Sequence, residues 1–302
     1  MRVWLDTDLG SDVDDALALA YALHHPDIEL VGISTVFGDV ELRTRCVEAL
    51  LAIAGKSSIP VLTGLGKPLT DRRAGVMFGH EGKGLISDPQ PRLKITSESE
   101  AQRESRMQEL AETLSAVAPD CVVAIGPLTN LGALVAMETT LPPLAIMGGK
   151  SESAVIPGMN DRIAEWNLFS DPVAARAVLG AESEQPSRIV PAEITFRTAL
   201  EASDLEKLSG GNALCVTLRT LCDHWLDFLA HGSGMPEPRV ALHDPLTIAS
   251  LMEPTLCPFE LRRVEVDDKG NLISVPGPAN VEIATDVDTS ALRSHLIETW
   301  LR

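Results

Sequence analysis

Hydrophobic residues alternate along the chain between short β-branched runs and stretches with helical spacing. The apolar runs predict strands at residues 3–5, 28–36, 59–62, 121–125, 144–147 and 188–190, with a late strand pair at 263–266 and 281–284. The helical spacing predicts helices at residues 14–23, 41–54, 100–117, 130–137, 212–230 and 289–301, with two more beginning at 171 and 243. This alternation predicts an α/β fold with a mostly parallel central sheet flanked by helices, and we expect residues 1–302 to form a single domain.

Polar residues concentrate where the predicted strands end. An acidic loop follows the first strand, Phe37-Gly38-Asp39 follows the second, and residues 126–130 follow a middle one. Ligands of such sheets bind beyond the carboxyl ends of the strands, so these segments are candidates for a site. Residues 66–98 contain several Gly and Pro residues and little periodicity, which predicts a long surface loop or lid.

Charge and cysteine content narrow the partners and the compartment. The net charge of −18, without a Lys/Arg cluster, argues against a nucleic-acid partner. The five cysteines are odd in number and widely spaced, which favours reduced thiols over disulfides or a zinc site. We find neither a secretory signal nor a membrane-length apolar stretch, and therefore expect a cytoplasmic protein with no membrane partner.

Five carboxylates stand within ten residues of the acidic loop: Asp6, Asp8, Asp12, Asp14 and Asp15. Such a density repels itself unless a cation neutralises it, and oxygen ligands favour Ca²⁺ or Mg²⁺ over Zn²⁺. The alternative is that the acids cap the following helix and face solvent. An EF-hand is excluded, because counting from Asp6 its fifth and twelfth positions are Gly10 and Leu17.

An apolar strand followed by Asp6-Thr7-Asp8 also resembles the first motif of haloacid-dehalogenase-type phosphatases. In that reading Asp6 is the nucleophile, Asp8 is the acid/base and Mg²⁺ is the cofactor. Such an enzyme also needs a lysine and a distal acidic pair. No clear arrangement of that kind is present in the sequence.

Five motifs in order resemble another family over residues 3–302. They are Asp6-Thr7-Asp8-Leu9-Gly10 with Asp14-Asp15-Ala16, Gly126-Pro127-Leu128-Thr129-Asn130, Ala164-Glu165-Trp166-Asn167, Asp171-Pro172, and His243-Asp244-Pro245. Together they are similar to the motifs of the inosine-uridine-type nucleoside hydrolases. The resemblance implies a Rossmann-like core, a bound Ca²⁺, hydrolysis of ribonucleosides to base and ribose in purine or pyrimidine salvage, and a homodimer or homotetramer.

The resemblance also implies roles for single residues. Asp8 would be both a metal ligand and the general base for a metal-bound water, and the other ligands would be Asp15, Asp244 and the carbonyl of Ile125. The residues that would bind the ribose hydroxyls are Asp14, Asn160, Glu165 and Asn167. His243 would act as a general acid or orient the base, while His80 and Trp225, with Phe228 and His231 nearby, would lie on the base side.

Physical chemistry agrees with these roles, because breaking a ribosyl C–N bond builds positive charge on the sugar, which carboxylates stabilise. Two departures from the family pattern leave questions open. Asp14 and Asp15 lie six and seven residues after Asp8 rather than four and five, so Asp12 could take over a ligand or sugar-binding role. Asp39 stands where the family commonly has Asn. A catalytically silent nucleoside- or metal-binding protein of the same fold remains an alternative.

Overall fold

The computed structural model describes residues 1–70, 73–156, 165–232 and 237–302. Within them an eight-stranded sheet has the order β10-β13-β9-β7-β6-β1-β2-β3. Its strands are β1 (Arg2–Thr7), β2 (Glu29–Thr35), β3 (Val61–Thr63), β6 (Cys121–Ala124), β7 (Leu144–Met147), β9 (Ser187–Val190), β10 (Phe259–Arg262) and β13 (Val281–Ala284). All neighbours pair in parallel except β10 with β13, so the predicted mostly parallel sheet is confirmed.

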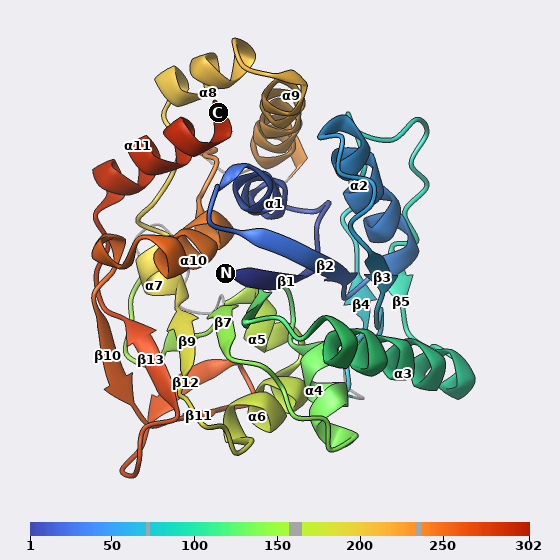
Figure 1. The fold of residues 1–302 in the computed structure, drawn as a ribbon, viewed down its shortest axis with the longest axis vertical. Coiled ribbons are helices and arrows are strands. Elements are labelled where there is room, and N and C mark those ends of the chain that lie inside the picture. Colours follow the sequence, from blue (N-terminus) through green and yellow to red (C-terminus); the bar gives the residue numbers. More distant parts are fainter. Residues whose placement is uncertain (71–72, 157–164, 233–236) are drawn as a thin grey trace.

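Helices cover both faces of this sheet (Figure 1). One face carries α1 (Asp14–His24), α2 (Val40–Ile53), α8 (Ala202–Ser209), α9 (Ala213–Asp227), α10 (His243–Met252) and α11 (Thr289–Trp300). The other carries α3 (Glu100–Val117), α4 (Thr129–Ala136), α5 (Trp166–Ser170) and α6 (Pro172–Gly180). Val3 and Leu5 belong to the core on the α1 side and Trp4 to the core on the α4 side, which is why β1 is apolar at successive positions.

The sequence signals for helix ends match the structure. Ser99 caps α3 by accepting a hydrogen bond from the amide of Gln102. Asp171 caps α6 through the amide of Ala174, with Pro172 in the first turn. The predicted helix at 212–230 is α9, which continues into a π-helical turn, Phe228–Gly232.

Both late strands predicted at 263–266 and 281–284 are present as β11 and β13, but they do not pair with each other. Two small sheets stand apart from the main one: β11 (Val264–Val266) with β12 (Asn271–Ser274) and β8 (Lys150–Ser151), and β4 (Gly75–Val76) with β5 (Lys94–Ile95). Residues 264–266 alternate between buried and exposed and pair with β12, whereas the mostly buried β13 lies between β9 and β10. The apolar runs identified both strands, but the sheet that each strand joins depends on whether one or both of its faces are buried.

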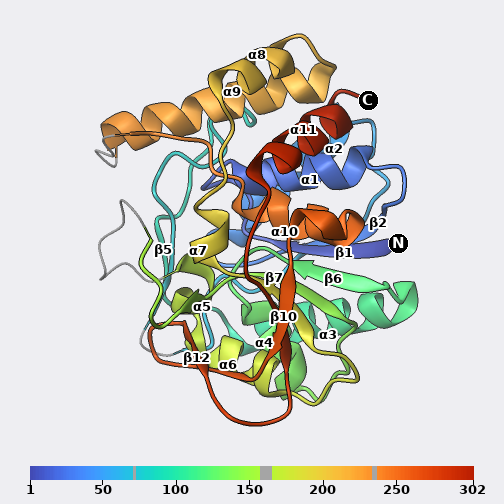
Figure 2. The same cartoon turned by 90° about the vertical axis from the view of Figure 1, so that its left-hand side faces the viewer.

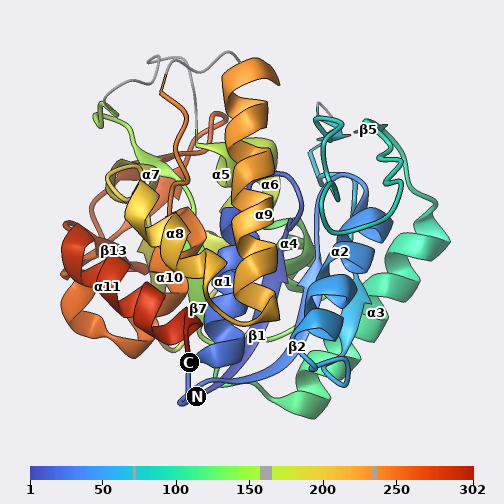
Figure 3. The same cartoon turned by 90° about the horizontal axis from the view of Figure 1, so that it is seen from above.

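The carboxyl ends of β1, β2, β6 and β7 share one edge of the sheet because these strands are parallel. Helix α9 extends toward this side, where the segment containing β5 also lies (Figure 2). Both termini lie on the opposite side (Figure 3). Two short elements complete the chain, α7 (Ala192–Thr195) and the 3₁₀ turn Pro254–Leu256. Among the described residues, no helix combines the length and apolarity that spanning a bilayer requires.

Candidate functional site

The acidic loop after β1 brings its carboxylates to the start of α1. Asp14 and Asp15 occupy the first helical turn, where the helix dipole favours negative charge. Asp244 occupies the first turn of α10, which packs against α1. The amide of Asp244 donates a hydrogen bond to Asp14 Oδ2 at 3.4 Å. Two helix starts far apart in the sequence therefore meet at one point.

The meeting point is a cavity of about 270 Å³ at the carboxyl end of the sheet. Asp14, Asp15 and Asp244 each place a carboxylate oxygen within 4.8 Å of the others, an arrangement that can hold a metal ion. Asp8 and Ile125 border the same cavity. A Cβ atom at Gly126 would lie 3.0 Å from Asp8 Oδ1, so glycine is needed for β6 to approach the loop this closely. All four predicted metal ligands thus border one cavity, although Asp14, and not Asp8, forms the close group with Asp15 and Asp244.

The carboxylates are buried together, and this raises their affinity for protons or for another cation. Burial, followed by repulsion from neighbouring aspartates, raises the pKa of Asp14, Asp15 and Asp244 well above the ordinary value. Burial also raises the pKa of Asp8, while the nearby Arg43 opposes the shift. Four buried carboxylates and a carbonyl, all oxygen donors, fit a hard divalent cation.

Arg43 is a member of this site that the sequence analysis missed. Its side chain is 1% exposed; Nε donates to Phe37 O at 2.6 Å, and Nη1 donates to the carbonyls of Asp8 and Leu9. Nη2 lies 3.7 Å from Asp8 Oδ2. The sequence signal that could have identified Arg43 is its spacing, three residues after Val40 and four before Val47, which places it on the buried face of α2.

Asp12 borders the cavity beside His243 rather than within the three-carboxylate group. Single ligand atoms of Asp12, Asp14 and His243 lie within 4.8 Å of one another. Burial raises the pKa of Asp12 to about 7. The extra length of the loop therefore adds a carboxylate on the side of the cavity where His243 lies.

Glu165 and Asn167 reach the cavity from the start of α5. Glu165 caps this helix: Oε1 accepts from the amide of Asn167 at 2.6 Å, and Oε2 from the amides of Gly149 and Leu168 at 2.7 and 2.9 Å. Asn167 Nδ2 donates to Ile125 O at 2.9 Å and to Met147 O at 3.1 Å. Burial raises the pKa of Glu165 to about 7. Asn160 lies outside the described residues.

His243 borders the cavity with its orientation fixed by Thr195. Its Nδ1 lies 2.7 Å from Thr195 Oγ1. The Thr195 hydroxyl also lies 3.4 Å from Ala192 O, to which it can donate a hydrogen bond. With its proton on Nδ1, the ring would donate to Thr195 Oγ1 and keep the lone pair on Nε2. Burial lowers the pKa of His243 to about 4, so the ring is neutral at pH 7.

Aromatic side chains form one wall of the cavity. We call Phe78, Trp166 and Trp225 the aromatic wall, since all three border the cavity. The rings of Phe78 and Trp166 lie 5.6 Å apart, and those of Trp225 and Phe228, three positions apart in the sequence, stack at 5.6 Å. Sequence analysis missed Phe78 and Trp166, which are 50% and 39% exposed.

Neither of the two histidines predicted on the base side, His80 and His231, borders the large cavity. His80 stacks on Phe228 at 3.9 Å and borders a neighbouring cavity of about 40 Å³ together with Trp225. His231 is exposed and pairs with Asp227 at 3.0 Å. His80 therefore packs against the ring of Phe228 and does not line the large cavity.

Two acids of the sequence motifs, Asp6 and Asp171, serve the fold and do not border the cavity. Asp6 is fully buried and accepts hydrogen bonds from Ser34 and from Asn130 Nδ2, the latter at 2.8 Å. Asp171 binds the amides of residues 69, 70 and 174 and Thr129 Oγ1. Asp6 does not border the cavity, so the phosphatase reading with Asp6 as nucleophile is wrong.

Asp39 is also a structural residue in this fold. It caps α2 through the amide of Leu42 at 3.4 Å and accepts from the amide and the Nη2 of Arg92 at 2.9 and 2.7 Å. It is absent from the residues that border the cavity. The carboxylate that replaces the family's Asn thus ties α2 to the long loop.

Comparisons with known proteins agree with this geometry. Residues 3–294 match the family described as inosine-uridine preferring nucleoside hydrolase. Uridine nucleosidase 1 of Arabidopsis thaliana is 29% identical over 282 residues, which cover 89% of this chain and 79% of the relative. The pyrimidine-specific ribonucleoside hydrolase of Salmonella enteritidis is 29% identical over 281 residues, covering 89% and 85%.

A solved structure gives the same result at the level of the fold. A plant nucleoside hydrolase superimposes with a TM-score of 0.78 at 25% identity, and the match covers 99% of this chain and 98% of that one. The predicted nucleoside hydrolase fold is therefore confirmed. The chain belongs to the inosine-uridine preferring nucleoside hydrolase family, enzymes that hydrolyse the N-glycosidic bond of ribonucleosides.

Proposed function

We propose that this nucleoside hydrolase works with Ca²⁺ held by Asp8, Asp15, Asp244 and the carbonyl of Ile125, and that Asp8 is its general base. The observation that carries the proposal is the meeting of the buried carboxylates beside a cavity with an aromatic wall. When bound, the cation would lower the pKa of a water molecule and hold ribose hydroxyls. Several protein oxygens in one place suit Ca²⁺ better than Mg²⁺, which usually keeps most of its waters.

Asp8 is suited to accept the proton of the attacking water. Its carboxylate borders the cavity and is 6% exposed, so a substrate-sized ligand can reach it. Arg43 holds the backbone carbonyls of Asp8 and Leu9, which fixes the position of the loop. A general base requires this kind of fixed distance to the proton it takes.

The sugar would be bound by Asp14, Glu165 and Asn167, and Asn160 stays a prediction for the same role. Three backbone N–H groups hold the carboxylate of Glu165 in place. A carboxylate fixed beside the ribose stabilises the positive charge that develops as the C–N bond breaks. Asn167 spans the ends of β6 and β7 and can hold one ribose hydroxyl with its side-chain oxygen.

The base would lie between the aromatic wall and His243. Phe78, Trp166 and Trp225 offer ring faces for stacking, which every nucleobase can use. His243 is neutral at pH 7, because burial lowers its pKa to about 4. Its Nε2 would therefore accept a hydrogen bond from the base and orient it, rather than supply a proton from an imidazolium ion.

The cellular role follows as part of the proposal. The five cysteines are buried and unpaired, which supports a reducing cytoplasm as the site of nucleoside salvage. We also propose a homodimer or homotetramer, which light scattering of the purified protein measures directly. A monomer at all concentrations would contradict the oligomer without affecting the chemistry.

The test of the proposed function is ribose release from a panel of uridine, cytidine, inosine, adenosine and guanosine. Asp8→Ala should lose at least about 100-fold in kcat, as expected for removal of a general base. Asp268→Ala is the matched control, since Asp268 is exposed and pairs with Arg176 away from the cavity. Unchanged kcat in Asp8→Ala would contradict the proposal, and tight Ca²⁺ binding without ribose release would show a silent binding protein.

A further inference from the structure

The loop that carries Asp8 is joined directly to the long loop that carries Phe78. Ser11 Oγ donates to Glu81 Oε1 at 3.2 Å and accepts from Arg43 Nη2 at 3.2 Å. The backbone of Ser11 makes a second link, because its carbonyl can only accept and therefore receives the Nε2 proton of His80 at 2.7 Å. Ser11 thus contacts the long loop through both its side chain and its backbone.

Glu81 folds the tip of the long loop around its own carboxylate. Oε1 accepts from the amide of Phe78 at 2.6 Å, and Oε2 accepts from the amide of Gly79 at 2.8 Å. Gly79 has φ +90°, a conformation that favours glycine and turns its amide toward Glu81. The Glu81 side chain is 1% exposed, so these hydrogen bonds are shielded from water.

Hydrogen bonds connect the loop that carries Asp8 to the aromatic wall through the Glu81 carboxylate. Arg43 donates to Ser11, and Ser11 and the Phe78 amide both donate to Glu81 Oε1. Each of these donors has an acceptor, so the network is satisfied. Phe78 borders the cavity, and its ring lies 5.6 Å from the ring of Trp166.

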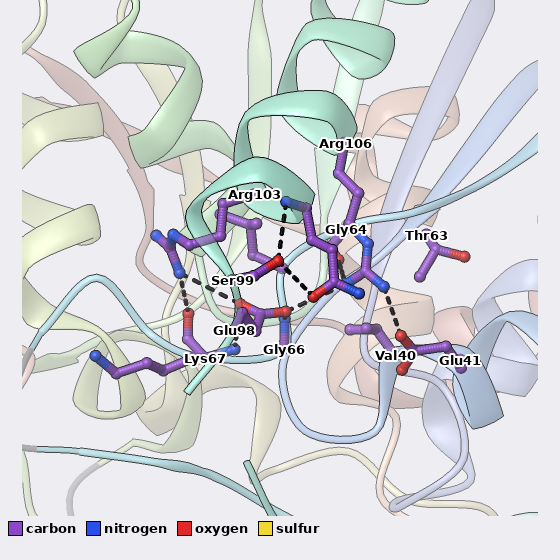
Figure 4. Close-up of polar contacts among 12 residues, drawn as sticks. Val40, Glu41, Thr63, Gly64, Gly66, Lys67, Glu98, Ser99, Arg103 and Arg106 are labelled. Atoms are coloured by element: carbon purple, nitrogen blue, oxygen red, sulfur yellow. Dashed lines mark hydrogen bonds and ion pairs between the residues drawn. The ribbon is translucent and has the colours of Figure 1, made fainter. Parts of the chain in front are cut away.

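The two ends of the long loop are held by other contacts. Glu98 accepts from the amides of Gly66 and Lys67 at 2.9 and 3.1 Å, and it lies between Arg103 and Arg106 (Figure 4). Arg92 lies between the tip of the long loop and its end at Glu98, and it pairs with Asp39 and Glu41. These ion pairs fix the base of the loop, whereas Ser11 contacts its tip.

We propose that Ser11 and Glu81 are positioning residues that set the base-stacking surface of Phe78 relative to the backbone of Asp8. This inference rests on the proposed function for the placement of the base, and it goes further by giving Ser11, on the border of the cavity, and the buried Glu81 a role in holding Phe78. Their role is to keep the ring face at a fixed distance from the sugar site. The alternative is that Glu81 only helps the long loop to fold.

The test uses Ser11→Ala, Glu81→Gln and the double variant, with Ser11→Thr as the rescue that keeps the hydroxyl. Glu41→Gln is the matched control, because Glu41 also contacts the long loop but through Arg92. Ser11→Ala and Glu81→Gln should raise KM for a nucleoside roughly tenfold with kcat changed less than about threefold, and leave inhibition by free ribose unchanged. The double variant should be no worse than the poorer single variant, because both act through one hydrogen bond.

Hydrogen exchange of the peptide covering residues 77–86 gives a readout that needs no turnover. Exchange at this peptide should rise in Ser11→Ala and Glu81→Gln, and remain as in the wild type in Ser11→Thr and Glu41→Gln. Wild-type KM and exchange in Ser11→Ala, multiplicative losses in the double variant, or an equal change in ribose inhibition would overturn the inference. If the wild type releases no ribose from any nucleoside, the proposed function fails, whereas the exchange result still decides whether Ser11 holds the loop tip.

Discussion

The amide of Asp244 donates to Asp14 Oδ2 at 3.4 Å, which links the first turns of α10 and α1. The carboxylates of Asp14, Asp15 and Asp244 meet at this contact. Each helix contributes the positive end of its dipole, which favours the negative charge gathered there. The site therefore depends on the packing of two helices that are separated by most of the chain.

Loss of one of these carboxylates should weaken metal binding. Asp244→Asn and Asp15→Asn each remove a negative charge from the group and should lower the affinity for Ca²⁺ at least about 100-fold. Calorimetric titration of the chelator-treated protein measures this affinity. Asp268→Asn serves as the surface control, and equal affinity in all three variants would remove these residues from the metal site.

The metal-free protein should lose stability as the pH rises through 7. Burial raises the pKa of Asp6 and Glu165 to about 7, well above their values in an unfolded chain. The folded state then holds protons that the unfolded state has lost, so deprotonation between pH 6.5 and 8 costs roughly 1 kcal/mol per group. His243, whose pKa burial lowers, opposes this trend only in part, because an unfolded histidine is half protonated at pH 6.5 and its deprotonation by pH 8 contributes at most about 0.4 kcal/mol.

Urea unfolding in the presence of a chelator measures this dependence. Added Ca²⁺ should raise the free energy of unfolding most at the higher pH, because it binds the ionised carboxylates. A free energy of unfolding that rises between pH 6.5 and 8 in the metal-free protein would contradict the burial of these acids.

Arg43→Met should destabilise the metal-free protein by about 3 kcal/mol or more, because the change leaves Asp8 without its nearby positive charge and three carbonyls without a donor. Urea unfolding compares it with Arg188→Met, which removes a partly buried arginine that binds Ser250 O and Glu282 far from the cavity. If Ca²⁺ supplies the missing charge, it should recover part of the loss in Arg43→Met and none in Arg188→Met. Equal Ca²⁺ responses would argue against a role for Arg43 at the site.

His243→Gln should affect substrates according to their leaving group. For nucleosides we expect a fall of about 100-fold in kcat/KM, and for a riboside with a p-nitrophenolate leaving group a much smaller one, because that group has no N–H for Nε2 of His243 to accept. Thr195→Val should give a weaker version of the same pattern, since the hydrogen bond between Thr195 Oγ1 and Nδ1 orients the ring of His243. An identical loss with both substrates would assign His243 to the sugar or metal site instead.

The sequence was informative where local pattern and chemistry coincide. Asp8, Asp14 and Asp15 could be predicted because a strand end and a helix start lie within ten residues of one another, and the burial of β1 on both faces appears as an unbroken apolar run. Glu165 and Asp244 required the family motifs, since nothing in their own neighbourhood indicates that they meet the aspartate loop.

Contacts between distant segments could not be predicted in this way. Arg43 appears as an ordinary helix residue until α2 packs against the loop, and Glu81 appears as a loop acid until Ser11 reaches it. Asp39 raised the question of a changed ribose contact, but its carboxylate binds Arg92, which lies 53 residues away in the sequence. In each case the partner is set by tertiary packing, which spacing and composition do not encode.

The most direct test of the account is ribose release from the nucleoside panel by chelator-treated protein during titration with Ca²⁺. The proposal predicts that chelation abolishes release and that Ca²⁺ restores it with one ion per chain, in step with calorimetric binding. Full activity in the chelator-treated, metal-free protein would contradict the central claim that the carboxylates of Asp8, Asp15 and Asp244 work through a bound cation.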